Sequence, residues 1–229
     1  MTTPSMEWFR HDWIGTAADF HAMELPLTRG LWWCQVESPS LILGSTQSVE
    51  DVLPDIASAR GVSVSRRRSG GGAVFVHPSD SLWIDITINR DDPLWNDDVV
   101  ESMLWLGECF VAALSPWVQA HVYRDTFVAG EDGRSVCFAS SSPGEVFVGS
   151  SKLVGISQRR SRDGARFQCV LYRHWRPDYW LASLADPHVR DRVAHLPVAT
   201  IDIEPSRLVD ALFQRLSGPG GEESGDIWG

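Results

Sequence analysis

Three consecutive glycines, Gly70 to Gly72, follow three consecutive arginines and lie between two apolar segments of the chain. The β-branched residues Val62 and Val64 before the arginines, and an apolar run after the glycines, predict a strand, a tight turn and a second strand. Because a run of glycines removes every Cβ over one turn, the backbone can adopt positive φ and approach a ligand closely. Successive N–H groups in such a turn form a concave anion site, and neighbouring arginines suit phosphate or carboxylate groups. The alternative is an ordinary hairpin turn with exposed arginines.

The distribution of charge favours a ligand site at this turn. The chain carries a formal net charge of −10, yet it groups the three arginines and has a second basic segment, Gly149 to Gly155, with Lys152 at its centre. A strongly acidic chain is a poor partner for nucleic acid or for an anionic membrane surface. We therefore expect no nucleic-acid or membrane partner, and we expect the local basic residues to contact a small ligand.

The cysteines and the N-terminal residues indicate a compartment. The four cysteines are far apart and include no Cys-x-x-Cys pair, which favours a reduced protein over a disulfide framework or a zinc site. The first residues have no apolar core of signal-peptide length, and no run approaches the length of a membrane span. We therefore expect a soluble, cytoplasmic protein.

Periodicity and turn residues predict one α+β domain over residues 1–217, with a mixed, largely antiparallel β-sheet core and flanking helices. The clearest strand is Ser81 to Asn89, where four apolar residues alternate with Trp83, Asp85 and Thr87. The other expected strands cover residues 31–36, 40–43, 62–65, 120–128, 135–139, 145–148, 152–158 and 166–172. The expected helices cover residues 16–25, 48–60, 96–116, 177–184, 186–195 and 205–216. The Gly/Glu-rich tail, residues 218–229, is expected to be disordered.

Three segments together resemble the lipoate–protein ligase family, which shares its catalytic fold with octanoyltransferases and biotin–protein ligases. They are Leu43-Gly44-Ser45-Thr46-Gln47, Arg66-Arg67-x-Ser69-Gly70-Gly71-Gly72-Ala73-Val74, and Lys152-Leu153-Val154-Gly155-Ile156-Ser157-Gln158-Arg159-Arg160. The second and third segments are specific when they occur together, and they fit the lipoate branch better than the biotin branch. The resemblance implies a class II synthetase-like catalytic domain.

The resemblance also implies an ATP-dependent lipoate–protein ligase. Lipoate or octanoate would be activated with ATP and Mg²⁺ as an acyl-adenylate, and a lysine of a lipoyl domain or glycine-cleavage H-type carrier would attack the acyl carbon. By this resemblance Lys152 is the catalytic cation at the acyl oxygen, and Arg67 contacts the α-phosphate. The other implied substrate- and nucleotide-binding residues are Ser69, Gly70, Gly71, Gly72, Ala73 and Gly155. Phosphate oxygens and water would hold Mg²⁺, so no metal ligand from the protein is expected.

Two alternatives remain at the level of the sequence. Octanoyltransferases of this superfamily form an acyl-thioester on a cysteine, and Cys169 follows the lysine segment on a predicted strand, where a nearby ammonium would favour the thiolate. The chain would then be a transferase that needs no ATP, and Cys137 is interpreted as structural. The second alternative is an acyl-binding homologue without catalytic turnover.

Two departures from the family pattern limit the interpretation. The family's histidine directly follows its Val-Phe pair, whereas Val76 precedes His77 here, and a shift of one residue in a strand reverses the face of a side chain. We therefore assign His77 no role. The helix expected at 205–216 leaves no room for the additional C-terminal domain of many ligases, so a small accessory subunit is a further expected partner. The sequence predicts neither the acyl-chain preference, nor the carrier, nor the oligomeric state.

Overall fold

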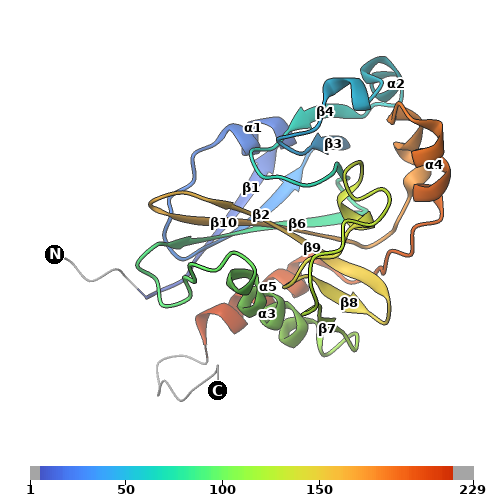
Figure 1. Ribbon diagram of the computed structural model, residues 1–229. Coiled ribbons are helices and arrows are strands. Elements are labelled where there is room, and N and C mark those ends of the chain that lie inside the picture. The colour runs from blue at the N-terminus through green and yellow to red at the C-terminus, as the bar shows by residue number, and fades with distance from the viewer. Residues whose placement is uncertain (1–5, 219–229) are drawn as a thin grey trace.

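A seven-stranded sheet runs through the centre of the structure, a computed structural model that describes residues 6–218 (Figure 1). Its order is β1-β2-β6-β10-β9-β8-β7, and only the pair of β1 and β2 is parallel. The strands are β1 (Phe9–Gly15), β2 (Gly30–Val36), β6 (Ser81–Asn89), β7 (His121–Val122), β8 (Val146–Val148), β9 (Ser151–Arg160) and β10 (Gly164–Tyr172). The predicted α+β class with a mixed, largely antiparallel sheet is confirmed.

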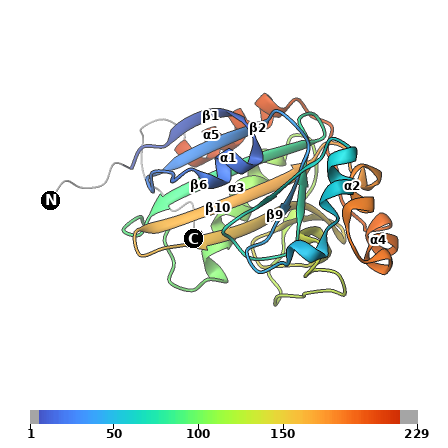
Figure 2. The same cartoon turned by 90° about the horizontal axis from the view of Figure 1, so that it is seen from above.

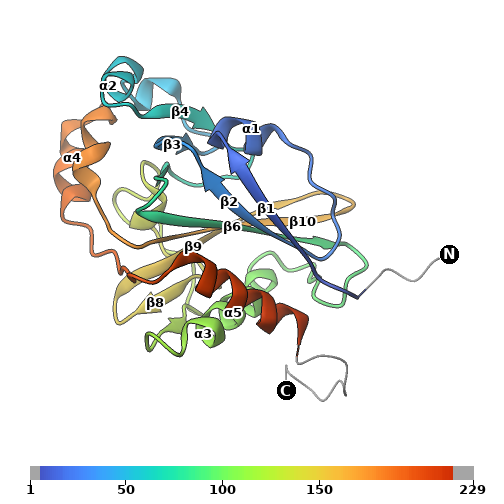
Figure 3. The same ribbon diagram turned by 180° about the vertical axis from the view of Figure 1, so that it is seen from behind.

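Two helices cover one face of this sheet. They are α3 (Leu104–Leu114) and α5 (Pro205–Ser217), which lie side by side below the strands in Figure 3. Leu82, Ile84 and Ile86 of β6 belong to the apolar core that these helices close. The predicted terminal helix is confirmed in α5, whose apolar stripe packs into this core.

Helix α1 (Ala17–Ala22) lies over the opposite face, as Figure 2 shows, and a second, smaller sheet covers the same face. The small sheet has the order β4 (Ser63–Arg66), β3 (Ser40–Leu43) and β5 (Val74–Val76), and its strands β3 and β4 are labelled in Figure 1. Because β6 is covered on both faces, its alternate residues Trp83, Asp85 and Thr87 are buried as well. The charge of Asp85 is compensated there by Arg166 of β10, whose Nε lies 2.6 Å from Asp85 Oδ2.

Short helices join these layers. They are the 3₁₀ helices η1 (Val49–Asp51), η2 (Glu101–Met103), η3 (Cys137–Ala139), η4 (Pro177–Tyr179) and η5 (Leu181–Ser183), with the α-helices α2 (Pro54–Ala59) and α4 (Pro187–Ala194). Within residues 6–218, no helix has both the length and the apolarity needed to cross a membrane.

Several predicted elements differ from the structure for identifiable reasons. The helix predicted from Asn96 begins only at η2, because residues 97–100 form a turn in which the Asp98 carboxylate accepts from the N–H of Val100 and Glu101. The helix predicted over 48–60 is divided, because Pro54 opens a new helix. Residues 137–139 form a 3₁₀ turn instead of a strand, and only two residues of 120–128 are paired as β7. Strand β1 is not among the predicted elements, and residues 219–229 of the predicted tail lie outside the described residues.

Candidate active site

The glycine turn is packed tightly against two other segments. A Cβ on Gly44 would lie 1.8 Å from the carbonyl oxygen of Gly71, and one on Gly72 would lie 2.6 Å from the backbone nitrogen of Val136. Gly71 itself has φ of +94°, a conformation that a side chain disfavours. In contrast, a Cβ on Gly70 would meet no atom within 4 Å. The fold therefore requires three of these glycines, but it does not require Gly70.

Arg67 holds the turn in place from inside. Its side chain is buried, and Nη2 donates to the carbonyl oxygens of Gly70 and Gly72, each at 2.8 Å. Nη1 donates to Ile42 O at 3.3 Å, while Nε has no partner among the described residues. Burial lowers the pKa of Arg67 from its usual range. Most of the Arg67 guanidinium group, which is predicted to bind phosphate, therefore already donates hydrogen bonds to backbone carbonyls.

The two neighbouring arginines point elsewhere. Arg66 donates to backbone carbonyls of the segment after β3, including Gly44 O at 3.1 Å. Arg68 forms an exposed ion pair with Glu24. Neither side chain lines the pocket described below.

Lys152 is the only lysine in the chain, and its side chain is buried with 2% exposed. Its Nζ donates to Glu145 Oε1 at 2.8 Å and to the carbonyl oxygen of Cys137 at 3.0 Å. The ammonium also lies 5.4 Å from the centroid of the Phe138 ring, within reach of a cation–π contact. Lys152 is thereby fixed at the start of β9, where Gly149 with φ of +56° turns the chain from β8.

Glu145 is the buried counter-ion of Lys152. The backbone N–H groups of Ser142 and Ile156 also donate to its carboxylate, at 2.8 and 3.3 Å. Burial raises the pKa of Glu145, while Lys152 and these hydrogen bonds oppose the shift. The sequence patterns assign Glu145 no role, although an acidic residue in an apolar strand segment close to the lysine is a usable signal.

An apolar pocket lies between the two sheets, beside the contact of the glycine turn with β9. Of the predicted site residues, Arg67 and Gly155 line this pocket, whereas Lys152, Ser69 and the three glycines do not. Ser69 Oγ lies 3.2 Å from Ser157 Oγ, which joins the turn to the strand that carries Lys152. The pocket is narrow, with a cavity of about 30 Å³. It is lined by His21, Ile42, Arg67, Val74, Trp83, Cys137, Phe138, Gly155, Ser157, Gln168 and Val170. Gly155 therefore lies in the pocket, whereas buried Ala73 pairs with Val136 behind the turn.

The structure does not bring the predicted nucleophile Cys169 to this pocket. Gln168 and Val170 of β10 line the pocket, so Cys169 between them points to the opposite face and into the core under α3 and α5. Its side chain is 1% exposed, and burial raises the pKa of its thiol well above the usual range. Cys137, for which a structural role is expected, is the cysteine that lines the pocket.

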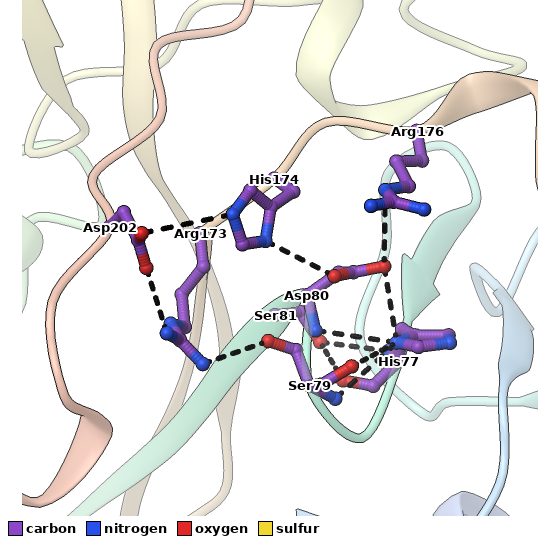
Figure 4. Close-up of polar contacts among 8 residues, drawn as sticks. All are labelled: His77, Ser79, Asp80, Ser81, Arg173, His174, Arg176 and Asp202. Carbon is purple, nitrogen blue, oxygen red and sulfur yellow. Dashed lines mark hydrogen bonds and ion pairs between the residues drawn. The ribbon is translucent and has the colours of Figure 1, made fainter.

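His77 lies outside the pocket and belongs to a turn. Its Nδ1 accepts from the backbone N–H of Ser79 and Asp80, each at 3.3 Å. Asp80 is in turn within 3.2 Å of His174 Nδ1 and within 3.8 Å of Arg176 Nε, as Figure 4 shows. These contacts tie the β5–β6 turn to the segment after β10, which is a structural role.

Metal-ligating side chains do not form a cluster in the part of the chain that the structure describes. Within 6–218, no group of three or more His, Cys, Asp or Glu side chains is arranged to hold an ion.

Comparison with known proteins identifies the type of catalytic domain. Several solved structures share the fold over 92% of this chain at 18–19% identity. A Thermoplasma acidophilum protein with lipoic acid bound gives a TM-score of 0.70 over 85% of its length. A lipoate-protein ligase A bound with ATP gives 0.67 over 84%, and a bipartite lipoate protein ligase of Thermoplasma acidophilum, described together with its E2 lipoyl domain, gives 0.67 over 83%.

The fold is thus that of a lipoate–protein ligase catalytic domain. The chain belongs to the lipoyl protein ligase A/B catalytic domain family, whose family profile matches residues 20–214. Among curated proteins, none is similar enough to the chain to count as a match.

Proposed function

We propose that the chain is a lipoate–protein ligase that activates lipoate or octanoate with ATP and transfers the acyl group to a lysine of a lipoyl-domain or H-type carrier protein. The observation that carries this proposal is the pocket beside the glycine turn: Arg67, which braces the turn, lines it together with Gly155 and Ser157 from the strand of the only lysine. Ser69 of the turn also contacts Ser157. Among solved structures of the same fold, one holds lipoic acid, one holds ATP and one is a ligase described with its lipoyl domain, which supports these ligand classes.

Lys152 would stabilise the charge that develops on the acyl oxygen. Its ammonium is held in advance by Glu145 and by the Cys137 carbonyl, so little reorganisation is needed during the reaction. Because Lys152 and Glu145 are both buried, bulk water does not weaken the attraction between their charges.

Gly70 is the position where a ligand could approach the backbone. The fold accounts for Gly71 and Gly72, whereas the space beside Gly70 is open. An anionic group next to Gly70 could therefore accept from backbone N–H groups of the turn. Arg67 would act mainly by bracing this turn, since its Nη2 atom donates to the carbonyls of Gly70 and Gly72. Mg²⁺, when bound, would neutralise phosphate charge, and it would enter the site bound to the phosphate oxygens of ATP.

A carrier-acylation assay tests the proposal. The purified protein is incubated with lipoate, Mg-ATP and an apo lipoyl domain, and the intact mass of the carrier is measured. We expect a lipoyl mass increase only with ATP, and a loss of roughly 10²–10³-fold in rate for Lys152→Met, as for removal of one charge-stabilising donor. Arg162→Met, which alters a fully solvated side chain, is the control and should retain the wild-type rate. Carrier acylation without ATP would contradict the ligase assignment.

One observation favours a second candidate, a thioester-forming acyltransferase. Cys137 lines the pocket, and a Cβ on Gly71 would lie 3.9 Å from its Sγ. In such a reaction the Cys137 thiolate would attack the carbonyl carbon of an acyl-thioester donor, and the donor thiol would leave with a proton. The amine of the carrier lysine would then form the amide, and its proton would return to the Cys137 sulfur.

Incubation with an octanoyl-thioester donor, without ATP, distinguishes this candidate. An acyl-enzyme mass that disappears in Cys137→Ala and persists in Cys169→Ala would support it. If the wild-type protein acylates the carrier only with free acid and ATP, the transferase is wrong. If neither assay gives product, the chain would be an acyl-binding homologue without turnover.

A further inference from the structure

A chain of buried polar side chains crosses the wall of the pocket away from Lys152. Ser69 Oγ donates to Gln168 Oε1 at 2.6 Å, so this end of the amide accepts. The other end, Gln168 Nε2, lies 3.1 Å from His21 Nδ1 and also hydrogen-bonds to the Asp85 carboxylate. Since an amide nitrogen only donates, Nδ1 of His21 is the acceptor in this pair.

This arrangement fixes the proton of His21 on the other ring nitrogen. Burial and the nearby charges of Arg166 and Arg67 lower the pKa of His21 to about 3, so the imidazole is neutral near pH 7. A neutral imidazole has one N–H, and with Nδ1 accepting it must be at Nε2. His21 is 7% exposed and lines the pocket, yet Nε2 has no hydrogen-bond partner among residues 6–218. A buried donor without a partner is costly, and this one belongs to a pocket wall.

His21 lies at the part of the pocket that is farther from Lys152. Lys152 is near the start of β9, whereas Ser157 further along the strand lines the pocket. Ser157 pairs with Gln168 of β10, which contacts His21. An acyl group with its carbonyl held near Lys152 would therefore place its far end near His21. The His21 ring lies 4.8 Å from the Trp83 ring at this distal end.

We propose that His21, through its Nε2–H, recognises an acceptor at the distal end of the acyl chain, and that the pocket thereby selects the dithiolane of a lipoyl group over the hydrocarbon end of an octanoyl group. This inference rests on the proposed function. A dithiolane sulfur can accept weakly from the N–H and can also pack against the Trp83 ring, as divalent sulfur does with aromatic side chains. A methyl terminus offers neither interaction, so it leaves the donor unpaired. His21 is therefore a specificity-determining residue for the end of the chain opposite the reacting carbonyl.

The test compares the affinities of lipoate and octanoate by isothermal titration calorimetry. In His21→Phe, which keeps an aromatic ring but loses the N–H, we expect lipoate affinity to fall about three- to tenfold, the range that one neutral hydrogen bond supplies. Octanoate affinity should change by less than about twofold, because a hydrocarbon end makes no hydrogen bond to lose. His21→Gln, which restores a donor, should recover part of the lipoate preference.

A matched control exists on strand β1 of the large sheet. His11 also stacks on a tryptophan, with its ring 3.9 Å from that of Trp32, but it does not line the pocket. His11→Phe should leave both affinities unchanged. A ¹⁵N spectrum of the wild-type protein adds a direct readout, in which lipoate but not octanoate should shift the Nε2–H resonance of His21.

The outcomes separate the inference from the proposed function. If the wild-type protein binds neither acid, the proposed function fails. If it binds both, and His21→Phe changes the two affinities by the same factor or changes neither, the role of His21 is overturned while the proposed function stands.

Discussion

At the scale of single residues, the chemistry of the pocket depends on one buried ion pair. Lys152 and Glu145 are each 2% exposed and lie 2.8 Å apart. A buried pair gains little net stability, because both ions lose their hydration, but loss of one partner leaves an uncompensated charge. The pair therefore holds a buried cation against Cys137 and Phe138, which line the pocket, and it makes the fold sensitive to changes at either residue.

A prediction follows for the counter-ion. Glu145→Gln should destabilise the protein by about 3–5 kcal/mol, since the Lys152 ammonium then remains buried without its charge partner. Replacing both residues, as Glu145→Leu with Lys152→Met, should restore much of this loss, because no unpaired charge remains. Urea denaturation of the variants measures the effect. Glu108→Gln is the control, since Glu108 pairs with Arg124 at the surface and should change stability by no more than about 1 kcal/mol.

At the scale of elements, the glycine turn is positioned by neighbours on both sides. Gly44 after β3 and the segment at Val136 leave no space for side chains, and Arg67 bonds to the turn from within. Such a turn is rigid before any ligand binds, which reduces the entropy lost on binding.

The glycines of the turn should respond differently to substitution. Gly72→Ala should destabilise the protein by about 1–3 kcal/mol, the usual cost of overpacking, because its Cβ would meet the backbone at Val136 and Gly133. Gly70→Ala should retain wild-type stability, because its Cβ enters open space, but it should weaken binding of an acyl-adenylate analogue. Thermal melts and titration with the analogue measure the two effects. Equal melting temperatures for both variants would contradict this account of the turn.

At the scale of the whole molecule, the pocket is a product of how the layers stack. The large sheet has a core on each face, and the pocket lies on the face covered by the small sheet and α1. His21 belongs to α1, so the helix that closes this layer also supplies a wall of the pocket. Stability and ligand binding are therefore coupled through the same side chain.

The coupling predicts a dependence of stability on pH. The pKa of His21 is lowered to about 3 in the fold from an ordinary value of 6.5, so between these values the unfolded chain binds a proton that the folded chain does not. The free energy of unfolding should therefore fall as the pH falls from about 6.5 towards 3, with a loss due to His21 of about 2–3 kcal/mol at pH 4.5.

Urea denaturation of wild type and His21→Phe at pH 7 and pH 4.5 isolates this contribution. Asp85 and Glu145, whose pKa values are raised by burial, act in the opposite direction, but they are common to both proteins. The wild-type protein should lose more stability on acidification than the variant. Identical losses would show that His21 titrates normally in the folded state.

The sequence predicts much of this architecture, and the exceptions have physical causes. The strict alternation in β6 and the apolar stripe of α5 can both be recognised in the sequence, and the structure shows Thr16 as the cap of α1, where its side chain accepts from Asp19 N–H. Strand β1 escapes prediction because its side chains are exposed or half-buried, so they show no clear apolar alternation.

The candidate site shows what local patterns cannot determine. The convergence of the glycine turn with the lysine strand follows from the segments once they are taken together. The sequence does not show whether Cys137 or Cys169 lines the pocket. Cys169 would line it only if the pocket lay on the other face of β10, because neighbouring residues of a strand point to opposite faces. The sequence does not predict the place of His21 in the pocket either, since no neighbouring residue in the chain indicates its contact with Gln168.

If the chain is the ligase proposed above, its solitary lysine also bears on how the protein is protected from the acyl-adenylate. Activated acyl groups react with any accessible amine, and the surface of this protein presents arginines in place of lysines. The one ε-amine is sequestered against Glu145. An acyl-adenylate that escaped into solution would find no lysine on its own catalyst to modify, which leaves the carrier as the productive acceptor.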